Sequence, residues 1–337
     1  MRLRSYILGD EEGILELRRD VFGSKDPFKL NRDAWEWEFL QNPEGESIII
    51  VAEEKAKIVG HYGLLPLKMS YYGKNVALAL AVDLMVHPSF RRKGLFLRLF
   101  EHIVEEAKRH NIDAILGFPN RITLPTYINK LGWHHVKSVK THVKISLKNL
   151  ITKSHTIMFT TNRSNFSLHD KSYMEFVRIS NFNDIPRFDN IASSQFIFIN
   201  RSPSYLNWRY IQPHWYQYIP YAILIESEIK GFFVLRFMSY KGFQVAVLID
   251  IFPMSLALPP IFSSLIQSIS SMCFFAGAGV FVFPDPIHGG SPFYGFSVQI
   301  PEHLSPRPWY VGWKDISSMG VPQGKDFYIT FGDGDII

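Results

Sequence analysis

The chain has 337 residues, of which 47% are hydrophobic and 20% charged, and this composition excludes global disorder and predicts one or two packed domains. Its 36 basic and 31 acidic residues give a net charge of only +5, which argues against a dedicated nucleic-acid surface and still suits a polyanionic cofactor. The single cysteine, Cys273, excludes an internal disulfide and CxxC metal sites. The N-terminal residues lack the apolar core of a signal peptide, so a cytoplasmic location is expected.

The first elements predicted along the chain are a strand and two helices. Residues Arg2–Leu8 alternate like a strand, and Glu11–Phe22 has helical spacing at Ile14, Leu15, Leu17, Arg18 and Val21. Asn31 is a plausible N-cap for a second helix over Asp33–Gln41.

Three antiparallel strands are expected next. Ser47–Ala52 is strongly apolar, and Lys57–Tyr71 and Asn75–Val86 read as two long strands. The short sequence Tyr72-Gly73-Lys74 joins the last two as a hairpin, with glycine at its turn.

The most informative stretch follows the last of these strands, where three cations and a glycine precede a helix. Residues 86–97 read Val-His-Pro-Ser-Phe-Arg-Arg-Lys-Gly-Leu-Phe-Leu. The first N–H groups of a helix are free, and its dipole is positive there, so this turn suits an anion. Gly94 lets the backbone approach the anion without a Cβ in the way. We interpret the turn as a pyrophosphate cradle; the alternative is an ordinary connection with solvated cations.

The remaining elements of the first half complete a mixed sheet with helices on both faces. They are a helix from Leu95 to His110, a strand over Asp113–Phe118, a helix over Thr126–Leu131 and a strand over Trp133–Ile145. A crossover helix after an antiparallel meander implies a parallel neighbour and a splayed point in the sheet, where ligands bind.

An internal duplication is indicated by five short matches that occur in the same order. The matches begin at Trp37 and Trp208, Met69 and Met238, Met85 and Asp250, Gly117 and Val282, and Leu131 and Tyr294. The spacing between Pro88 and Pro253 is 165 residues, and the spacing between Pro119 and Pro284 is the same. The second copy lacks the cationic turn, so a phosphate-bearing ligand is expected to bind the first half only.

The domain boundary is expected in a polar stretch without clear periodicity. We predict a first domain over 1–148, a linker over 149–170 and a second domain over 171–337, which closes with a strand and tail over 328–335. Residues 251–284 carry no charge, but prolines and serines interrupt them, so a buried helix is expected there rather than a membrane span.

These residues resemble the GNAT-type acetyltransferase superfamily, whose motif Arg/Gln-x-x-Gly-x-Gly/Ala lies between the fourth strand and the next helix. Residues Arg91 to Gly94 fit the motif, whereas Phe96 replaces its final small residue. Asn120, Tyr127 and the closing Leu131-Gly132-Trp133 also match the family pattern. The resemblance covers most of residues 1–145, and the second half looks like a degenerate copy. It implies two tandem GNAT-like α/β domains.

The resemblance also implies acetyl-CoA, or another acyl-CoA, as the acyl donor. The pantetheine arm would lie along the fourth strand as an added edge strand does, and the pyrophosphate would sit on the turn. Asn120 would hydrogen-bond the pantetheine or orient a water, or else cap the chain after Pro119. The residues expected to bind the cofactor are therefore Leu84, Met85, Val86, Arg91, Arg92, Lys93, Gly94, Leu95, Phe96, Leu97 and Asn120.

Three side chains are candidates for the chemistry. Tyr127 is the candidate acid, because a phenol holds its proton at neutral pH and can donate it to a thiolate; its alternative role is core packing beside Trp133. Asp83 and His61 are rival bases; the first would otherwise form a buried ion pair and the second a structural hydrogen bond. A water chain is a third possibility. Backbone N–H groups around Met85 and Val86 are the expected oxyanion donors.

The sequence thus predicts an acyltransferase that acts on a primary amine of a small molecule or an amino sugar, without a metal, nucleic-acid or membrane partner. Aromatic residues including Trp35, Trp37, Tyr205 and Trp208 would line the acceptor site or pack helices onto sheets. Two alternatives stay open. One is an aminoacyl-tRNA-dependent transferase of the same fold, and the other is a non-catalytic acyl-CoA-binding or interaction module.

Overall fold

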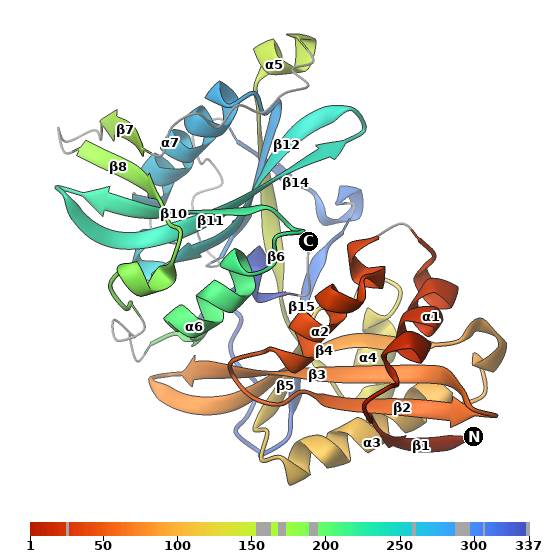
Figure 1. The fold of residues 1–337 in the computed structure, drawn as a ribbon. Helices are drawn as coiled ribbons and strands as arrows, with labels where there is room; N and C mark the ends of the chain where they lie inside the picture. Colours follow the sequence, from red (N-terminus) through yellow and green to blue (C-terminus); the bar gives the residue numbers. More distant parts are fainter. Residues whose placement is uncertain are drawn as a thin grey trace. The chain divides into compact units, whose positions relative to one another are not determined.

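The structure, a computed structural model, divides the chain into two compact units that are each built from two segments (Figure 1). It describes residues 1–24, 27–152, 163–167, 173–188, 195–257, 261–286, 297–305 and 307–334. The first unit comprises Met1–Lys137 with Tyr310–Pro322, and the second comprises Ser138–Trp309 with Gln323–Ile337. Much of the predicted linker over 149–170 lies outside the described residues.

The first unit follows the predicted order of elements as far as its last helix, whereas most of the predicted strand over Trp133–Ile145 belongs to the second unit. The elements of the first unit are β1 (Arg2–Ser5), α1 (Glu11–Phe22), η1 (Phe28–Leu30), α2 (Arg32–Leu40), β2 (Ile48–Glu54), β3 (Lys57–Tyr71), β4 (Lys74–Val86), η2 (Pro88–Phe90), α3 (Leu95–Arg109), β5 (Ala114–Gly117), α4 (Leu124–Leu131) and β15 (Trp309–Asp315). The strands run in the order β1-β2-β3-β4-β5-β15. As predicted, the Asn31 side chain caps α2 by accepting a hydrogen bond from the Asp33 amide at 2.8 Å.

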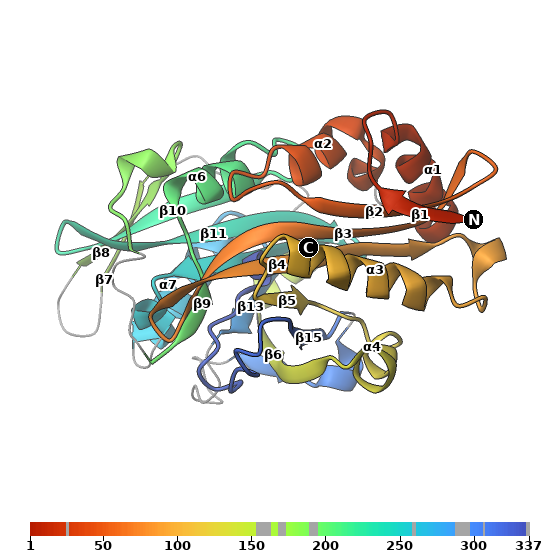
Figure 2. The ribbon, with the colours of Figure 1, turned by 90° about the horizontal axis from the view of Figure 1, so that it is seen from below.

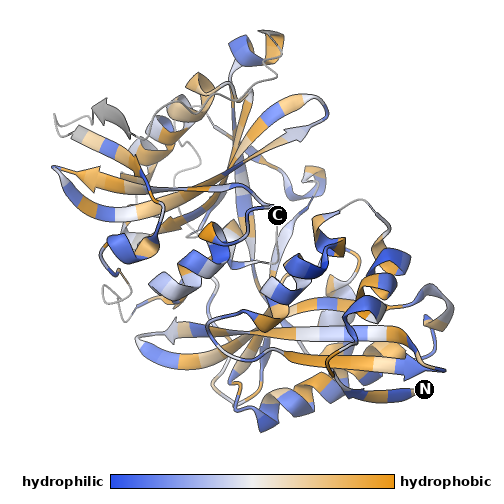
Figure 3. Ribbon diagram, viewed as in Figure 1, coloured by the Kyte–Doolittle hydropathy of each residue, from blue (hydrophilic) through white to orange (hydrophobic). Residues whose placement is uncertain are grey.

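Helices cover both faces of this sheet (Figure 2). A Cβ at Gly60 would lie 3.0 Å from Leu99 of α3, whereas a Cβ at Gly63 would lie 2.5 Å from Phe39 of α2. Successive strand residues point to opposite faces, so α2 covers one face of β3 and α3 the other. Figure 3 shows polar and apolar positions along α3, and its predicted inward residues Leu95, Leu99, Ile103 and Ala107 are all buried.

The second unit repeats the same plan. Its elements are β6 (His134–Ile145), α5 (Leu147–Thr152), β7 (Arg163–Ser167), β8 (Tyr173–Arg178), η3 (Phe182–Asp184), β9 (Ile197–Ile199), α6 (Pro203–Leu206), η5 (Asn207–Ile211), β10 (Tyr218–Ile225), β11 (Glu228–Tyr240), β12 (Phe243–Phe252), η6 (Met254–Ala257), α7 (Ile261–Phe275), β13 (Val280–Asp285), β14 (Val298–Ile300), η7 (Glu302–Leu304) and η8 (Phe331–Asp333). Strand β12 pairs antiparallel with β11 and parallel with β13, as β4 does with β3 and β5. The repeat agrees with the duplication predicted from the sequence.

Each unit takes its last strand from the other half of the sequence. Strand β5 pairs with β15 in the first unit, and β13 pairs with β6 in the second. Trp133 covers the β5–β15 pair, since a Cβ at Gly117 or at Gly312 would lie 3.0 Å from its ring. Each predicted domain, 1–148 and 171–337, is one continuous stretch of sequence, whereas each compact unit combines two separate stretches. The two ranges therefore remain a prediction of where the two sequence copies begin and end.

The C-terminal residues differ from the expected closing strand. Residues 328–330 have no regular structure, and η8 follows them. Here the Asp333 carboxylate accepts a hydrogen bond from the Thr330 amide at 2.7 Å, and its other oxygen lies 2.7 Å from Arg201. Arg201 also pairs with Asp250 at 3.1 Å, and all three side chains are buried. Local capping and a buried ion-pair network thus replace strand pairing at this end of the chain; Asp335 lies outside the described residues.

The charge-free stretch forms a buried helix, as predicted. Helix α7 buries Leu265, Ile269 and Cys273 among its apolar positions, and burial raises the pKa of the Cys273 thiol. In the described part of the chain, no helix is both long and apolar enough to cross a membrane.

We expect His142 to make the second unit less stable in acid. Burial lowers the pKa of His142 to about 4, so below its ordinary value of about 6.5 the unfolded chain binds the proton more readily than the folded one. The free energy of unfolding should therefore fall as the pH drops from about 6.5 towards 4. In His142→Phe, which keeps an aromatic ring against Phe283, denaturant titrations across this range should give a shallower pH dependence. An unchanged slope would contradict the assignment, and exposed His110→Gln is the control.

Candidate functional site

Strand β4 carries a bulge at Asp83, beside the predicted splay of the sheet. His61 of β3 pairs with Met85 and Gly63 pairs with Val82, so Tyr62 faces two residues of β4 instead of one. Asp83 has a φ of 52°, a left-handed conformation that is uncommon away from glycine and costs about 1–3 kcal/mol. Bulges re-aim strand groups next to active sites. The sequence did not reveal this one.

The splay itself begins where the bulge begins. Strand β4 pairs with β5 from Leu78 to Ala81, so residues 82–86 have no partner strand on that side among the described residues. Amides of an antiparallel strand point alternately to either side. The His87 amide bonds to Val59 of β3, so the Met85 amide also faces β3, whereas the Val86 amide faces the splay.

The cationic turn is open to solvent. Gly94, the residue before α3, has a φ of 76°, and no atom lies within 4 Å of a Cβ built there. Arg92 also has a positive φ, of 61°. Arg91, Arg92, Lys93 and Gly94 are all exposed. The backbone there is therefore open on the side that an anion would approach, and its side chains can accommodate negative charge.

Two of the three cations also make contacts within the turn. The Arg91 Nε donates to the Val86 carbonyl at 3.3 Å, which ties the turn to the end of β4. The Lys93 ammonium lies 5.2 Å from the centre of the Phe90 ring. Arg92 has no ion-pair partner within the described residues.

Phe96 departs from the family motif but does not cover the turn. Its half-buried ring packs against the core under the sheet and meets Tyr127 edge-on at 6.2 Å between ring centres. Leu95 is buried beside it, and Leu97 is exposed. The ring thus faces Tyr127 of α4, and the space beside Gly94 is open.

Tyr127 lies in an aromatic cluster on the α3 side of the sheet. It is buried and meets Trp133 at 5.0 Å between ring centres. Burial raises the pKa of Tyr127 to about 12, and the neighbouring Tyr62 hydroxyl opposes this rise. The phenol therefore keeps its proton throughout the neutral range.

The Asn120 side chain caps the turn before α4, which is the structural role considered as the alternative to cofactor binding. Its side-chain oxygen accepts hydrogen bonds from the amides of Ile122 and Thr123, both at 2.9 Å. The residue is exposed, and these bonds organise the turn that leads into α4.

Asp83 forms a buried ion pair with Arg18 of α1. One carboxylate oxygen lies 2.5 Å from Nη2, and the other is held by Nη1 of the same guanidinium. The two side chains are 4% and 6% exposed. Because both oxygens are engaged, this geometry favours the structural role for Asp83 over the role of a base. The helical spacing of the sequence includes Arg18, but it does not identify Asp83 as its partner.

His61 is the second base candidate and is held by the same bulge. Its Nδ1 lies 2.8 Å from the Asp83 carbonyl oxygen, which can only accept, so Nδ1 carries the proton. Its Nε2 is buried and has no hydrogen-bond partner among the described residues. Burial lowers the pKa of His61, so the ring is neutral with a free lone pair on Nε2.

The candidates lie on opposite faces of the sheet. His61 meets Phe39 of α2 edge-on at 5.7 Å between ring centres, and Asp83 meets α1. Tyr127 and Phe96 lie on the other face, with α3 and α4. The bulge at the splay is therefore flanked by the unpartnered Nε2 of His61 on one face and by the protonated phenol of Tyr127 on the other.

Two further sequence expectations concern aromatic residues and metals. The four aromatic side chains considered for an acceptor site are 2–5% exposed, which agrees with packing: Trp35, Trp37, Tyr205 and Trp208. No cluster of metal-ligating side chains occurs among the described residues.

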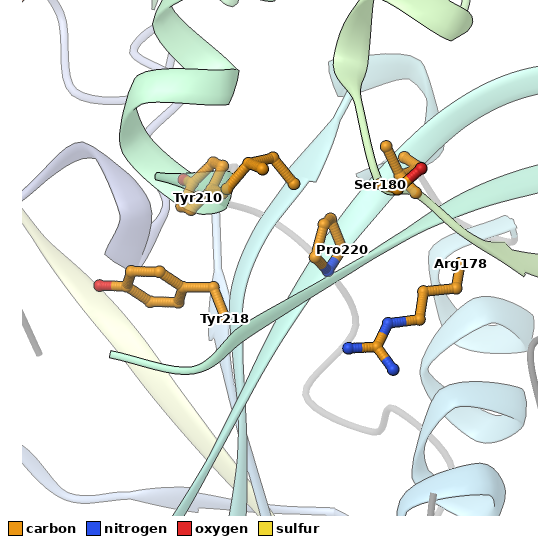
Figure 4. Close-up of a pocket in the computed structure, with 7 residues that line it drawn as sticks. Arg178, Ser180, Tyr210, Tyr218 and Pro220 are labelled. Carbon is orange, nitrogen blue, oxygen red and sulfur yellow. The ribbon is translucent and has the colours of Figure 1, made fainter. Parts of the chain in front are cut away.

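A pocket of about 520 Å³ opens in the second unit and was not predicted. Figure 4 shows the rings of Tyr210 and Tyr218 on one side of it, Arg178 opposite and Pro220 between them. The Tyr210 hydroxyl is engaged, because it donates to Asp250 at 2.8 Å. The pocket contains none of the predicted cofactor-binding or catalytic residues.

Comparison with known proteins identifies the domain. Residues 2–136 match the family model of the GNAT acetyltransferase domain. A search among proteins of curated function finds no match to the chain.

Solved structures share the fold across nearly the whole chain. A GCN5-related N-acetyltransferase from Anabaena variabilis aligns with a TM-score of 0.60 at 11% identity, covering 94% of this chain and 73% of that one. A probable N-acyltransferase from Enterococcus faecalis gives 0.58 at 9% identity, with 94% and 73% covered. Saccharomyces cerevisiae N-myristoyltransferase with bound myristoyl-CoA gives 0.58 at 13% identity, with 93% and 82% covered.

These matches agree with the tandem α/β plan described above. Residues 2–136 thus form a GNAT acetyltransferase domain, and the chain as a whole has a mixed α/β fold of two tandem GNAT-like domains.

Proposed function

We propose that the protein transfers an acetyl group, or another acyl group, from acyl-CoA to a primary amine of a small molecule or an amino sugar. The observation that carries this proposal is the bulge at Asp83, which opens the sheet beside an exposed cationic turn. The GNAT fold supports acyl transfer from acyl-CoA in general. The acetyl donor, the amine acceptor and the cytoplasmic location are finer predictions.

The residues at the splay and the turn fit an acyl-CoA. Gly94 leaves open space at a left-handed position, and Arg92 and Lys93 flank it with positive charge. These residues, with the free amides of Leu95, Phe96 and Leu97, would hold a pyrophosphate. The Leu84–Val86 edge of β4 would bind the pantetheine arm by main-chain hydrogen bonds. Acyl-CoA supplies the thioester whose acyl group is transferred.

Backbone and phenol have separate roles in this proposal. The Val86 amide faces the splay, so we assign it, rather than Met85, as the donor to negative charge that develops on a carbonyl oxygen there. One such donor contributes about 10²–10³ in rate. Tyr127 holds a proton that it can give to a leaving thiolate, and its raised pKa keeps that proton in place at neutral pH.

His61 is the proposed proton acceptor. Its neutral Nε2 has the lone pair that deprotonation of an ammonium requires, whereas both oxygens of Asp83 are bound by Arg18. A water chain from the acceptor face could carry the proton to this nitrogen. Asp83 then acts on the backbone that holds His61.

The two alternatives make different demands on the chain. An aminoacyl-tRNA donor calls for a wide basic surface, which the modest net charge of +5 does not favour. A ring of Phe96 across the turn would favour a non-catalytic module, because it would crowd the pyrophosphate, but this ring packs towards Tyr127. Thiol release during incubation with acetyl-CoA and a panel of amines distinguishes an enzyme from such a module.

Calorimetric titration with CoA tests the turn. The double variant Arg92→Ala/Lys93→Ala should raise the Kd for CoA about a hundredfold or more, since hydrogen bonds to charged groups contribute about 1.5–3 kcal/mol each and about 1.4 kcal/mol is a factor of ten. Lys230→Ala removes an exposed cation from the second unit and should leave the Kd unchanged. Equal Kd values in all three proteins would show that the turn is misassigned, and no binding of wild type at millimolar CoA would exclude the enzyme.

Tyr127→Phe tests the proton donor. The ring keeps its contacts with Phe96 and Trp133, but the thiolate loses its acid, so kcat should fall about 10²–10⁴-fold while the Kd for CoA stays within twofold. Steady-state thiol release measures kcat. Tyr71→Phe removes a half-buried hydroxyl elsewhere in the same unit and serves as the control, with kcat near wild type. Wild-type kcat in Tyr127→Phe would assign Tyr127 to packing alone.

Asn120→Ala separates capping from cofactor binding. Loss of the two amide hydrogen bonds before α4 should lower the free energy of unfolding by about 0.5–2 kcal/mol, measured by denaturant titration. The Kd for CoA should change less than twofold. A large rise in Kd with unchanged stability would instead make Asn120 a cofactor ligand.

A further inference from the structure

We propose that Arg18 is a positioning residue for acyl transfer, which acts by holding the β4 bulge through its ion pair with Asp83. This inference rests on the proposed function. Arg18 belongs to α1, 65 residues before Asp83 in the sequence, and matches no motif of the family resemblance. Its role follows from its bidentate contact with Asp83, which fixes the position of that side chain.

The first step is the backbone of Asp83. Asp83 has a left-handed φ of 52°, which aspartate adopts more readily than most residues but which is still less favourable than an extended conformation, so contacts that fix its side chain help to keep it there. The Arg18 fork binds both carboxylate oxygens in a buried setting, and this contact fixes the direction of the Asp83 side chain. Fixing the side chain opposes rotation of the backbone out of the bulge.

The second step leads from the bulge to the site. The Asp83 carbonyl accepts the Nδ1 proton of His61, so the bulge orients the ring and leaves Nε2 as the acceptor. The Val86 amide lies three residues further along the same strand. If Asp83 relaxed to an extended conformation, both the carbonyl that holds His61 and the strand that presents Val86 would turn.

Arg18 itself is held by its helix. It is 5% exposed on the inward face of α1, and its guanidinium also lies 5.9 Å from the centre of the Phe22 ring. Lysine would keep the charge but not the fork that binds two oxygens. The inference therefore requires the guanidinium and not merely a cation.

The chain offers a matched control in the same unit. Arg4 pairs with Asp10 through two nitrogens, at 2.6 and 2.9 Å, and this pair is also largely buried, with side chains 16% and 9% exposed. Its contacts are with β1, β2 and the start of α1, away from the bulge. Arg4→Met thus breaks a comparable ion pair without touching the site.

The experiment compares Arg18→Lys, Arg18→Met and Arg4→Met in the full chain. We expect kcat for thiol release to fall about tenfold or more in both Arg18 variants, with the Kd for CoA within twofold of wild type. Arg4→Met should keep wild-type kcat. Nitrogen NMR of the His61 ring should show the Nδ1-protonated tautomer in wild type and Arg4→Met, and a mixture of tautomers in the Arg18 variants.

A second variant covers the case in which Arg18→Met does not fold. Arg18→Met/Asp83→Asn removes the buried charge that would be left unpaired, together with the ion pair that fixes residue 83. Its kcat should remain low, because nothing holds the bulge. Wild-type kcat in this double variant or in Arg18→Lys, or an equal loss in Arg4→Met, would overturn the inference and leave the proposed function intact. Wild-type protein that binds no CoA would overturn the proposed function instead.

Discussion

The site depends on one local constraint, the left-handed conformation of Asp83 in the middle of β4. An extended residue there would continue the pairing register, and β4 would keep its regular contact with β3. The bulge shifts the register by one residue at the point where pairing with β5 ends. Strand groups beyond it therefore face an open edge, and the turn at Gly94 follows directly. The ion pair to Arg18 and the hydrogen bond to His61 both converge on this residue.

The duplication shows which part of this arrangement belongs to the fold and which to the cofactor. In the second unit, Val234 pairs with Asp250 and Leu235 with Leu248, so β12 has a bulge at Ile249, where β4 has one. The turn after β12 is apolar, and its Leu256 is buried. A bulge thus occurs in both copies, whereas the exposed cationic turn occurs only in the first. This contrast agrees with anion binding as the reason for the cations.

Local sequence patterns predicted the helices, strands and turns well, but they did not predict the contacts between residues far apart in the sequence. The apolar spacing of α3, the Asn31 cap and the Gly73 hairpin are encoded within a few residues, and each was found as expected. The exchange of β6 and β15 could not be predicted, because both strands fit either sheet locally and only tertiary pairing distinguishes them. The direction of the Phe96 ring and the partner of Asp83 depend on α4 and α1, which are far away in the sequence.

In both halves, the sequence alone leaves open whether an acidic residue in an apolar strand is a base or the partner in a buried ion pair. Asp83 and Asp250 each lie near the C-terminal end of a central strand, and each proves to be paired with a buried arginine, Arg18 and Arg201. Sequence reasoning could read either as a base of raised pKa, because burial without a partner produces one. A buried carboxylate with a bidentate arginine instead fixes geometry, and the proton acceptor has to be sought on a neighbour that the carboxylate positions. In the first unit that neighbour is His61, whose free Nε2 is a consequence of the bond that Nδ1 makes to the bulge.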